Sequence, residues 1–109
     1  MRSPGSGKGR VKKLPLAPRA EADLDEIFDY LAPRSPRGAA RVIQGLLEQC
    51  ERVCDTPLGY PACEALRAGL RRAVYRPYLI FFTLDKTGVR IERIVHGARD
   101  LPSLFKEWG

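Results

Sequence analysis

Residues 70–100, LRRAVYRPYLIFFTLDKTGVRIERIVHGARD, decide the fold, because they hold three short runs of β-branched and aromatic residues separated by turn signals. The runs cover residues 70–75, 78–84 and 89–96. Arg76-Pro77 marks the first turn, where proline sets φ at the second position, and Gly88 supplies the positive φ that closes the second turn. This stretch predicts an antiparallel meander of three strands.

The pattern of each run predicts which faces of its strand are covered. Residues 78–84 are apolar on both faces, which is typical of a central strand. Strict alternation divides the last run into two faces. One face holds Ile91, Arg93 and Val95, and the other holds Arg90, Glu92, Ile94 and His96. Charged side chains are therefore expected on the surface of the sheet.

Two amphipathic helices are predicted before the meander. The first begins at Pro18 and ends before Pro33, and the second begins with Ser35 as N-cap and ends before Pro57. Apolar residues recur at helical spacing in both segments. They are Ala20, Leu24, Ile27, Phe28 and Leu31 in the first, and Ala39, Val42, Ile43, Leu46, Leu47, Cys50, Val53 and Cys54 in the second. The short connection predicts an antiparallel helical hairpin that packs on the meander.

The flanking segments complete an α+β fold of order β-α-α-β-β-β with a mainly antiparallel sheet. Residues 1–10 are expected to be a disordered basic tail, and residues 11–109 a single domain whose first strand, Val11 to Leu16, lies at an edge because of Pro15. In the loop before the meander, Leu58 and Leu66 are expected to anchor to the core. A short helical turn with an apolar side follows residue 100.

Length and composition restrict the class of protein. The chain has 109 residues, no apolar run near the about 20 residues of a membrane span, and no signal-peptide apolar region after its basic start. We therefore expect a cytoplasmic protein with no membrane partner. The cysteines Cys50, Cys54 and Cys63, without a paired Cys-x-x-Cys motif, are a poor zinc set beside one histidine. No metal or cofactor is expected.

Charge is distributed unevenly along the chain. The net charge is +5 over residues 1–13, −4 over residues 14–64 and +5 over residues 65–109. A basic last third suggests that the sheet meets an anionic partner, either phosphate or an acidic protein surface, although arginine also serves simply to keep a surface soluble. Charge alone does not choose between these interpretations.

Five sequence motifs, in this order, resemble those of the ParE branch of the RelE/ParE toxins. They are ADLDEIFDYL (22–31), SPRGAARVI (35–43), LRAGLRR (66–72), YLIFF (78–82) and IVHGARD (94–100). The resemblance covers about residues 14–105. It implies a RelE/ParE-like fold and the function of a toxin in a type II toxin–antitoxin module. It also implies a small ParD-like antitoxin, which binds the toxin in a hetero-oligomer and neutralises it.

The resemblance leaves two chemistries open. RelE-like members cleave messenger RNA on the ribosome, and here such a site would use His96 as acid or base with Arg72 and Arg99 as phosphate clamp. ParE-like members inhibit DNA gyrase by binding. We favour gyrase binding, because the sheet is poor in lysine and the C-terminal tail lacks a tyrosine. A plain basic nucleic-acid-binding module is a third hypothesis.

Candidate contact residues follow from these hypotheses. For the target they are Arg71, Arg72, Arg93, His96 and Arg99, and for the antitoxin they are Leu24, Phe28, Tyr75, Tyr78, Arg90 and Trp108. Purely structural interpretations compete with these roles. His96 would donate to a backbone carbonyl, Arg99 would pair with Asp100, and Arg71 and Arg72 would face opposite sides of the sheet.

Overall fold

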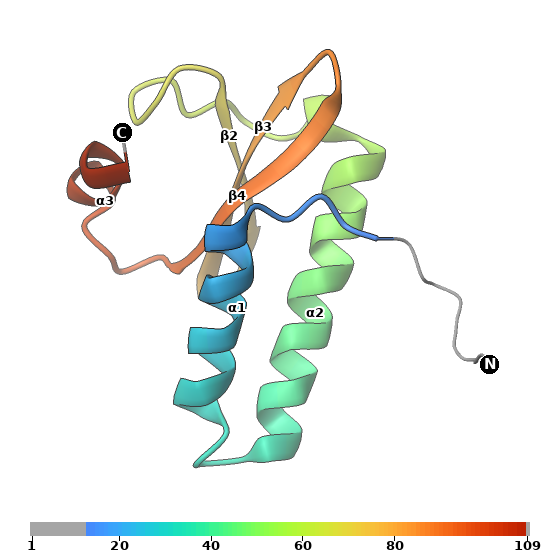
Figure 1. The fold of residues 1–109 in the computed structure, drawn as a ribbon, viewed down its shortest axis with the longest axis vertical. Coiled ribbons are helices and arrows are strands. Elements are labelled where there is room, and N and C mark those ends of the chain that lie inside the picture. The colour runs from blue at the N-terminus through green and yellow to red at the C-terminus, as the bar shows by residue number, and fades with distance from the viewer. Residues whose placement is uncertain (1–12, 109) are drawn as a thin grey trace.

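The computed structural model describes residues 13–108, with side chains described as far as Lys106. Its elements are α1 (Pro18–Leu31), α2 (Pro36–Asp55), η1 (Pro57–Gly59), β2 (Leu70–Tyr75), β3 (Tyr78–Asp85), β4 (Gly88–His96) and α3 (Leu101–Trp108) (Figure 1). The predicted α+β fold, with a helical hairpin and a three-stranded meander, is confirmed. Residues 1–10, predicted to be a disordered tail, lie outside the described residues.

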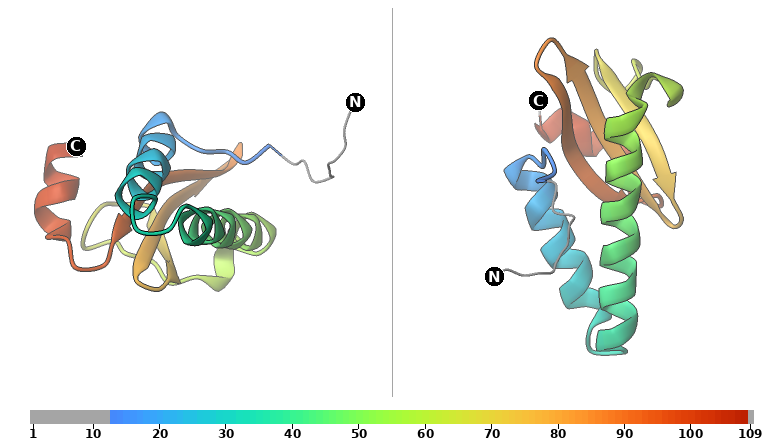
Figure 2. Two further views of the ribbon diagram at one scale, coloured as in Figure 1. Left: turned by 90° about the horizontal axis from the view of Figure 1, so that it is seen from below. Right: turned by 90° about the vertical axis from the view of Figure 1, so that its right-hand side faces the viewer.

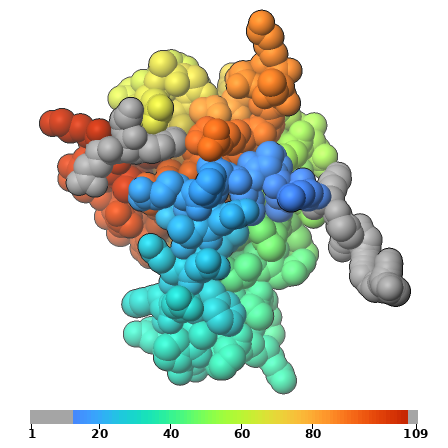
Figure 3. All heavy atoms as spheres, in the orientation of Figure 1, coloured from blue at the N-terminus to red at the C-terminus, as the bar shows by residue number. Residues whose placement is uncertain are grey.

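Local chemistry explains where the helices begin. Each of the two long helices has a proline in its first turn, where no backbone N–H is needed for the helix. The Ser35 Oγ accepts a hydrogen bond of 2.9 Å from the Gly38 N–H, as an N-cap does. The helices run antiparallel, and the turn that joins them projects beyond the sheet as a lobe (Figures 1 and 3).

The sheet has the order β2-β3-β4, and both of its pairings are antiparallel. Gly88 has φ of 116° in the second turn, as predicted. The first turn differs from the prediction, since Pro77 occupies its third position and follows a cis peptide bond. That arrangement belongs to a type VI turn.

An irregular register in β4 overturns the predicted alternation of its faces. Phe81 is opposite Arg93 whereas Phe82 is opposite Ile91, so Glu92 is an extra residue between them. Such a bulge reverses the facing of the residues beyond it. Ile91 and Ile94 therefore pack together in the core under the hairpin, and Arg93 does not share a face with Ile91.

Apolar residues cover the sheet on both faces. Figure 2 shows, from two further directions, the helices and strands that contribute them. The larger core joins the hairpin to the sheet and includes Ala20, Leu24, Leu46, Cys50, Val53, Ala73, Tyr78, Ile80, Phe82, Ile91 and Ile94. The smaller core joins the opposite face to α3 and includes Leu70, Phe81, Val95, Leu104 and Phe105. The prediction that residues 78–84 form a central, doubly covered strand is confirmed.

The predicted first strand is reduced to a single bridge in the described residues. Leu16 pairs in parallel with Ile91, whose N–H donates to the Pro15 carbonyl and whose carbonyl accepts from the Ala17 N–H. Continuing a parallel ladder toward Val89 would need an N–H at residue 15, and proline has none. Residues 11 and 12 of that predicted strand lie outside the described residues.

Two predictions about the loop and the cysteines have different outcomes. Leu66 packs against the smaller core as predicted, but Leu58 is 71% exposed and anchors nothing. Cys50 is buried, and burial raises the pKa of its thiol to about 12, so it behaves as a small apolar residue. None of the helices within residues 13–108 is long and apolar enough to cross a membrane.

Candidate functional site

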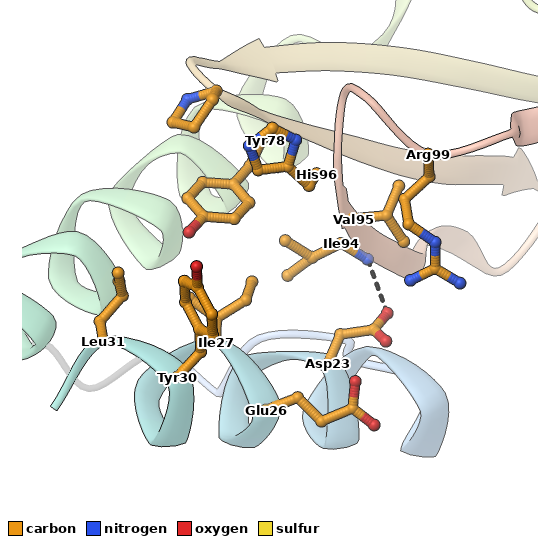
Figure 4. Close-up of a pocket in the computed structure, with 11 residues that line it drawn as sticks. Asp23, Glu26, Ile27, Tyr30, Leu31, Tyr78, Ile94, Val95, His96 and Arg99 are labelled. Carbon is orange, nitrogen blue, oxygen red and sulfur yellow. Dashed lines mark hydrogen bonds between the residues drawn. The ribbon is translucent and has the colours of Figure 1, made fainter. Parts of the chain in front are cut away.

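A groove of about 630 Å³ lies between α1 and the end of the sheet where β3 begins and β4 ends (Figure 4). One wall comes from α1 and consists of Asp23, Glu26, Ile27, Tyr30 and Leu31. The other wall consists of Pro77, Tyr78, Ile94, Val95, His96 and Arg99. The α1 residues are spaced three and four apart, so a single face of one helix forms that wall.

A buried ion pair holds α1 against the edge of the sheet. The Arg93 Nε donates to Asp23 Oδ2 at 2.8 Å, and Arg93 Nη2 donates to Oδ1 at 3.0 Å. The Ile94 N–H, on the outer strand, also donates to Oδ2 at 2.8 Å. The exposed fractions of Asp23 and Arg93 are only 5% and 3%. The Asp23 charge is therefore compensated within the fold, and Arg93 is not available on the surface to contact a target.

His96 closes the sheet side of the groove. It is exposed, and its ring lies edge-on to Tyr78, with ring centroids 5.7 Å apart. Its Nδ1 accepts a hydrogen bond of 3.1 Å from the Ala98 N–H, rather than donating to a carbonyl as the structural interpretation expected. This bond assigns the neutral ring the tautomer with hydrogen on Nε2, which remains available as a donor.

Arg99 lines the same wall of the groove as His96, and its charge is not paired with any described side chain. Asp100 is occupied as the N-terminal cap of α3, with its Oδ2 accepting from Ser103 Oγ at 2.9 Å. The expected ion pair between Arg99 and Asp100 is absent from the described residues, which offer Arg99 no other ion-pair partner. Figure 4 shows the Arg99 guanidinium at the same end of the groove as Asp23 and Glu26.

Two tyrosines mark the opposite end of the groove. Their hydroxyls point toward each other across it (Figure 4). Tyr30 is 67% exposed, and the centroid of its ring lies 5.7 Å from the guanidinium carbon of Arg34. Tyr78, in contrast, is buried in the larger core. Burial, and secondarily the neighbouring Tyr30, raises the pKa of Tyr78, so its hydroxyl stays protonated and can donate a hydrogen bond.

The structure separates the three residues of the hypothetical nuclease site. His96 and Arg99 line the same groove, but Arg72 does not. Arg72 is opposite Phe81 and so faces the smaller core on the other side of the sheet. Arg71 is opposite Phe82 on the hairpin side, where its Nη1 donates to the Tyr60 carbonyl at 2.7 Å. Arg71 and Arg72 thus face opposite sides, as expected.

The sequence of this chain matches a known protein family. Residues 14–101 match the family described as the ParE toxin of the type II toxin–antitoxin system parDE. The chain belongs to the ParE toxin family. Toxin ParE1 of Caulobacter vibrioides is 36% identical to this ParE-family chain over 90 residues, which are 79% of this chain and 90% of the relative.

A solved structure supports the fold of this ParE-family member. It is described as the chromosomal ParDE TA system from P. aeruginosa, and it superposes with a TM-score of 0.66. The match covers 74% of this chain and 90% of that chain, at 24% sequence identity. At that identity the likeness is one of fold.

The residues predicted to contact an antitoxin are scattered over this ParE fold. Leu24 is 8% exposed within the larger core, so a partner does not reach it. Tyr75 is half-buried with its ring against Gly45 of α2. Phe28 is 38% exposed, the Arg90 side chain is 60% exposed, and the Tyr78 ring lines the groove. The side chain of Trp108 lies outside the described part of the chain.

Sequence reasoning missed Tyr30 and Glu26 as groove residues. Both lie on the α1 face that also presents Asp23, Ile27 and Leu31. The helical spacing of these five positions is visible in the sequence. What the sequence did not show was which strand end would lie opposite that face.

Proposed function

We propose that this chain is the growth-inhibiting toxin of a ParDE-type pair, that it acts by binding DNA gyrase, and that a ParD-like antitoxin neutralises it. The observation that carries the choice of binding over catalysis is the separation of Arg72 from His96 and Arg99. Cleavage of RNA needs an acid or base and a phosphate clamp within hydrogen-bond reach of the same reacting group.

We place the gyrase contact on the sheet-side wall of the groove, where His96 and Arg99 are both exposed. His96 offers an Nε2–H donor there, and Arg99 offers a guanidinium that has no ion-pair partner among the described residues. Arg71 and Arg72 are half-buried strand residues, and we retain them as secondary contacts. Arg93 is left out, because its guanidinium is engaged by Asp23 in the interior.

The proposed antitoxin is a small, partly disordered chain that orders on binding. A segment of this kind covers a large surface and pays an ordering entropy at the moment of binding. The basic last third of the toxin, with net charge +5 over residues 65–109, attracts its carboxylates.

One feature favours a RelE-type nuclease as the second candidate. The groove brings His96 near Tyr30 and Tyr78, side chains that are able to transfer protons, with Arg99 as a phosphate-binding cation. In that case cleavage of messenger RNA during translation would be lost in both His96→Ala and Arg99→Ala, with the fold intact.

A pair of assays with the purified full chain tests the proposal. Supercoiling by gyrase is measured beside translation of a defined messenger RNA, each with and without the chain. We expect inhibition of supercoiling, no cleavage of the message, and relief on adding the co-purified antitoxin. Ribosome-dependent cleavage with undisturbed supercoiling would instead establish the nuclease.

A further inference from the structure

We infer that the end of the molecule at the α1–α2 turn binds the phosphate backbone of the duplex DNA that gyrase holds. Four arginines form this surface, which we call the basic end: Arg34, Arg37, Arg41 and Arg76. The source of the DNA rests on the proposed function, because it requires gyrase as the target. The inference adds a second ligand, nucleic acid, to the protein contact proposed above.

Three of the arginines lie on the lobe that extends past the end of the sheet (Figures 1 and 2). Arg34 is in the turn between α1 and α2, and Arg37 and Arg41 are in the first two turns of α2. The two arginines of α2 are four residues apart, so they share one face of the helix. All three residues are exposed.

Arg76 approaches this surface from the turn between β2 and β3. A Cβ at Gly45 would collide with the ring end of Tyr75, so that ring lies against α2 on the face that also presents Arg41, four residues earlier. Arg76 directly follows Tyr75 and is exposed. The basic end therefore joins cations from two separate parts of the chain.

The charge of the basic end is not compensated within the described part of the chain. Residues 30–47 and 73–84 contain the four arginines and no aspartate or glutamate. None of the four forms an ion pair with a described residue. The guanidinium carbon of Arg34 lies 5.7 Å from the ring centroid of Tyr30, and the N–H groups of a guanidinium held over a ring can still donate to an anion.

The chemistry of the basic end favours phosphate over an acidic protein surface. Its cations are all arginines, whose planar fork donates two parallel hydrogen bonds to a phosphate. The described lysines, Lys13, Lys86 and Lys106, lie on other segments. Protein–protein interfaces have an apolar core, whereas protein–DNA interfaces are polar and positively charged. Residues 32–41 contain no large apolar side chain, which fits the second kind of interface.

The charges of α1 restrict the direction from which DNA can approach. Its exposed carboxylates are those of Glu21, Asp25, Glu26 and Asp29. They repel phosphates, so the duplex passes over the α2 side of the lobe and away from the outer surface of α1. Contacts between arginine and phosphate contain no sequence information, so this binding should not depend on the sequence of the DNA.

The basic end adjoins the proposed contact with gyrase. Leu31 and Pro77 line the same groove as His96 and Arg99. Pro77 directly follows Arg76, and Leu31 ends the helix that leads into the turn of the lobe. One side of the molecule can therefore contact gyrase and its DNA at the same time.

Two triple variants of the full chain that lose the same charge test the inference. One combines Arg34→Gln, Arg37→Gln and Arg41→Gln, and the control combines Lys13→Gln, Lys86→Gln and Lys106→Gln. All six residues are exposed, so circular dichroism and the melting temperature should stay close to those of the unmodified chain. Both variants keep residues 1–12, so any contribution of these residues to DNA binding is the same in each.

The first measurement is a fluorescence anisotropy titration of a labelled duplex of mixed sequence at several salt concentrations. The slope of log affinity against log salt falls by about 0.9 for each phosphate contact that is lost. We expect the arginine variant to bind about tenfold or more weakly at about 0.1 M salt, with a slope smaller by about 2–3, and the lysine control to change the slope by less than about 1. Equal slopes and affinities for the two variants would overturn the inference.

The second measurement is inhibition of supercoiling by gyrase. We expect the arginine variant to need about tenfold more protein for half inhibition, and the lysine control to stay within about threefold of the unmodified chain. Weaker inhibition with unchanged DNA binding would mean that the basic end contacts gyrase itself, and weaker DNA binding with unchanged inhibition would mean that the DNA is not the DNA held by gyrase. Either result would overturn the inference and leave the proposed function standing.

Failure of the proposed function gives a different result. In that case the unmodified chain leaves gyrase active, whereas the anisotropy titration still decides whether the basic end binds phosphate.

Discussion

At the scale of single residues, Asp23 has the largest structural role in the groove, because it accepts three hydrogen bonds at a buried position. Asp23→Ala would leave the Arg93 charge and the Ile94 N–H buried without that partner. We expect a loss of about 3–5 kcal/mol in the free energy of unfolding, measured with urea. The exposed neighbour Asp25 is the control, and Asp25→Ala should change stability by less than about 0.5 kcal/mol. A similar, small effect of both substitutions would contradict the role assigned to the ion pair.

Asp85, at the turn between β3 and β4, has a carboxyl group whose lowered pKa can be tested. The Thr87 hydroxyl and backbone N–H, 2.6 and 2.8 Å from Asp85 Oδ1, hold the pKa of Asp85 below its ordinary value. A lowered folded-state pKa means that this stabilisation is present above the ordinary value and is lost as pH falls through the lowered one. Thr87→Ala should therefore raise the Asp85 pKa in a carboxyl-carbon NMR titration, with part of the lowering kept by the backbone bond. An unchanged pKa would show that the hydroxyl has no such effect.

At the scale of elements, the packing of α2 on β2 depends on a glycine in the middle of a helix. A Cβ at Gly45 would collide with the ring end of Tyr75, so the close approach requires glycine although glycine weakens a helix. We expect Gly45→Ala to destabilise the protein by about 1–3 kcal/mol in thermal or urea unfolding. In a Tyr75→Ala background the same substitution should instead stabilise it by up to about 1 kcal/mol, through helix propensity alone. Destabilisation of equal size in both backgrounds would remove Tyr75 from the explanation.

The elements also show which features were predictable from sequence. The helix starts at Pro18 and Ser35 and the ends of the strands are determined by residues that are neighbours in the sequence. The predicted boundaries agree with the structure to within one residue. The prediction of which β4 side chains share a face was wrong, because the bulge at Glu92 involves partners that are distant in the sequence. Glu92 accepts a hydrogen bond of 2.8 Å from Thr83, and Arg93 is drawn to Asp23, which is 70 residues away. Periodicity within one run of residues contains no information about such contacts.

At the scale of the whole molecule, the candidate site was only partly predictable. His96 and Arg99 were expected near each other because one short turn connects them. The opposite wall was missed, since Glu26 and Tyr30 join the site only when α1 docks on the edge of β4. Arg72 was grouped with His96 by residue type, and only the sheet register shows that the two face opposite sides.

The charge distribution of the whole molecule leads to a prediction about salt. Between about 0.1 M and about 1 M salt, the electrostatic screening length falls from about 10 Å to about 3 Å, so contacts between exposed charges weaken. We expect the affinity for the antitoxin to fall steadily over this range, because the net charge of +5 over residues 65–109 and the groove charges contribute to it. Affinity that does not change with salt would reject charge complementarity as a cause of binding.

Deleting residues 1–13 in the same titration distinguishes this mechanism from a plain nucleic-acid-binding module. Those residues hold five basic and no acidic side chains. If the last third and the groove carry the interaction, the shortened chain should keep its antitoxin affinity within about threefold and its salt dependence, because the deletion removes no residue of the last third and none of the described residues that line the groove. The opposite result would be that the full chain binds duplex DNA, that this binding is lost on deletion and in high salt, and that neither form binds the antitoxin. That result would indicate that the positive charge of the chain serves to bind nucleic acid.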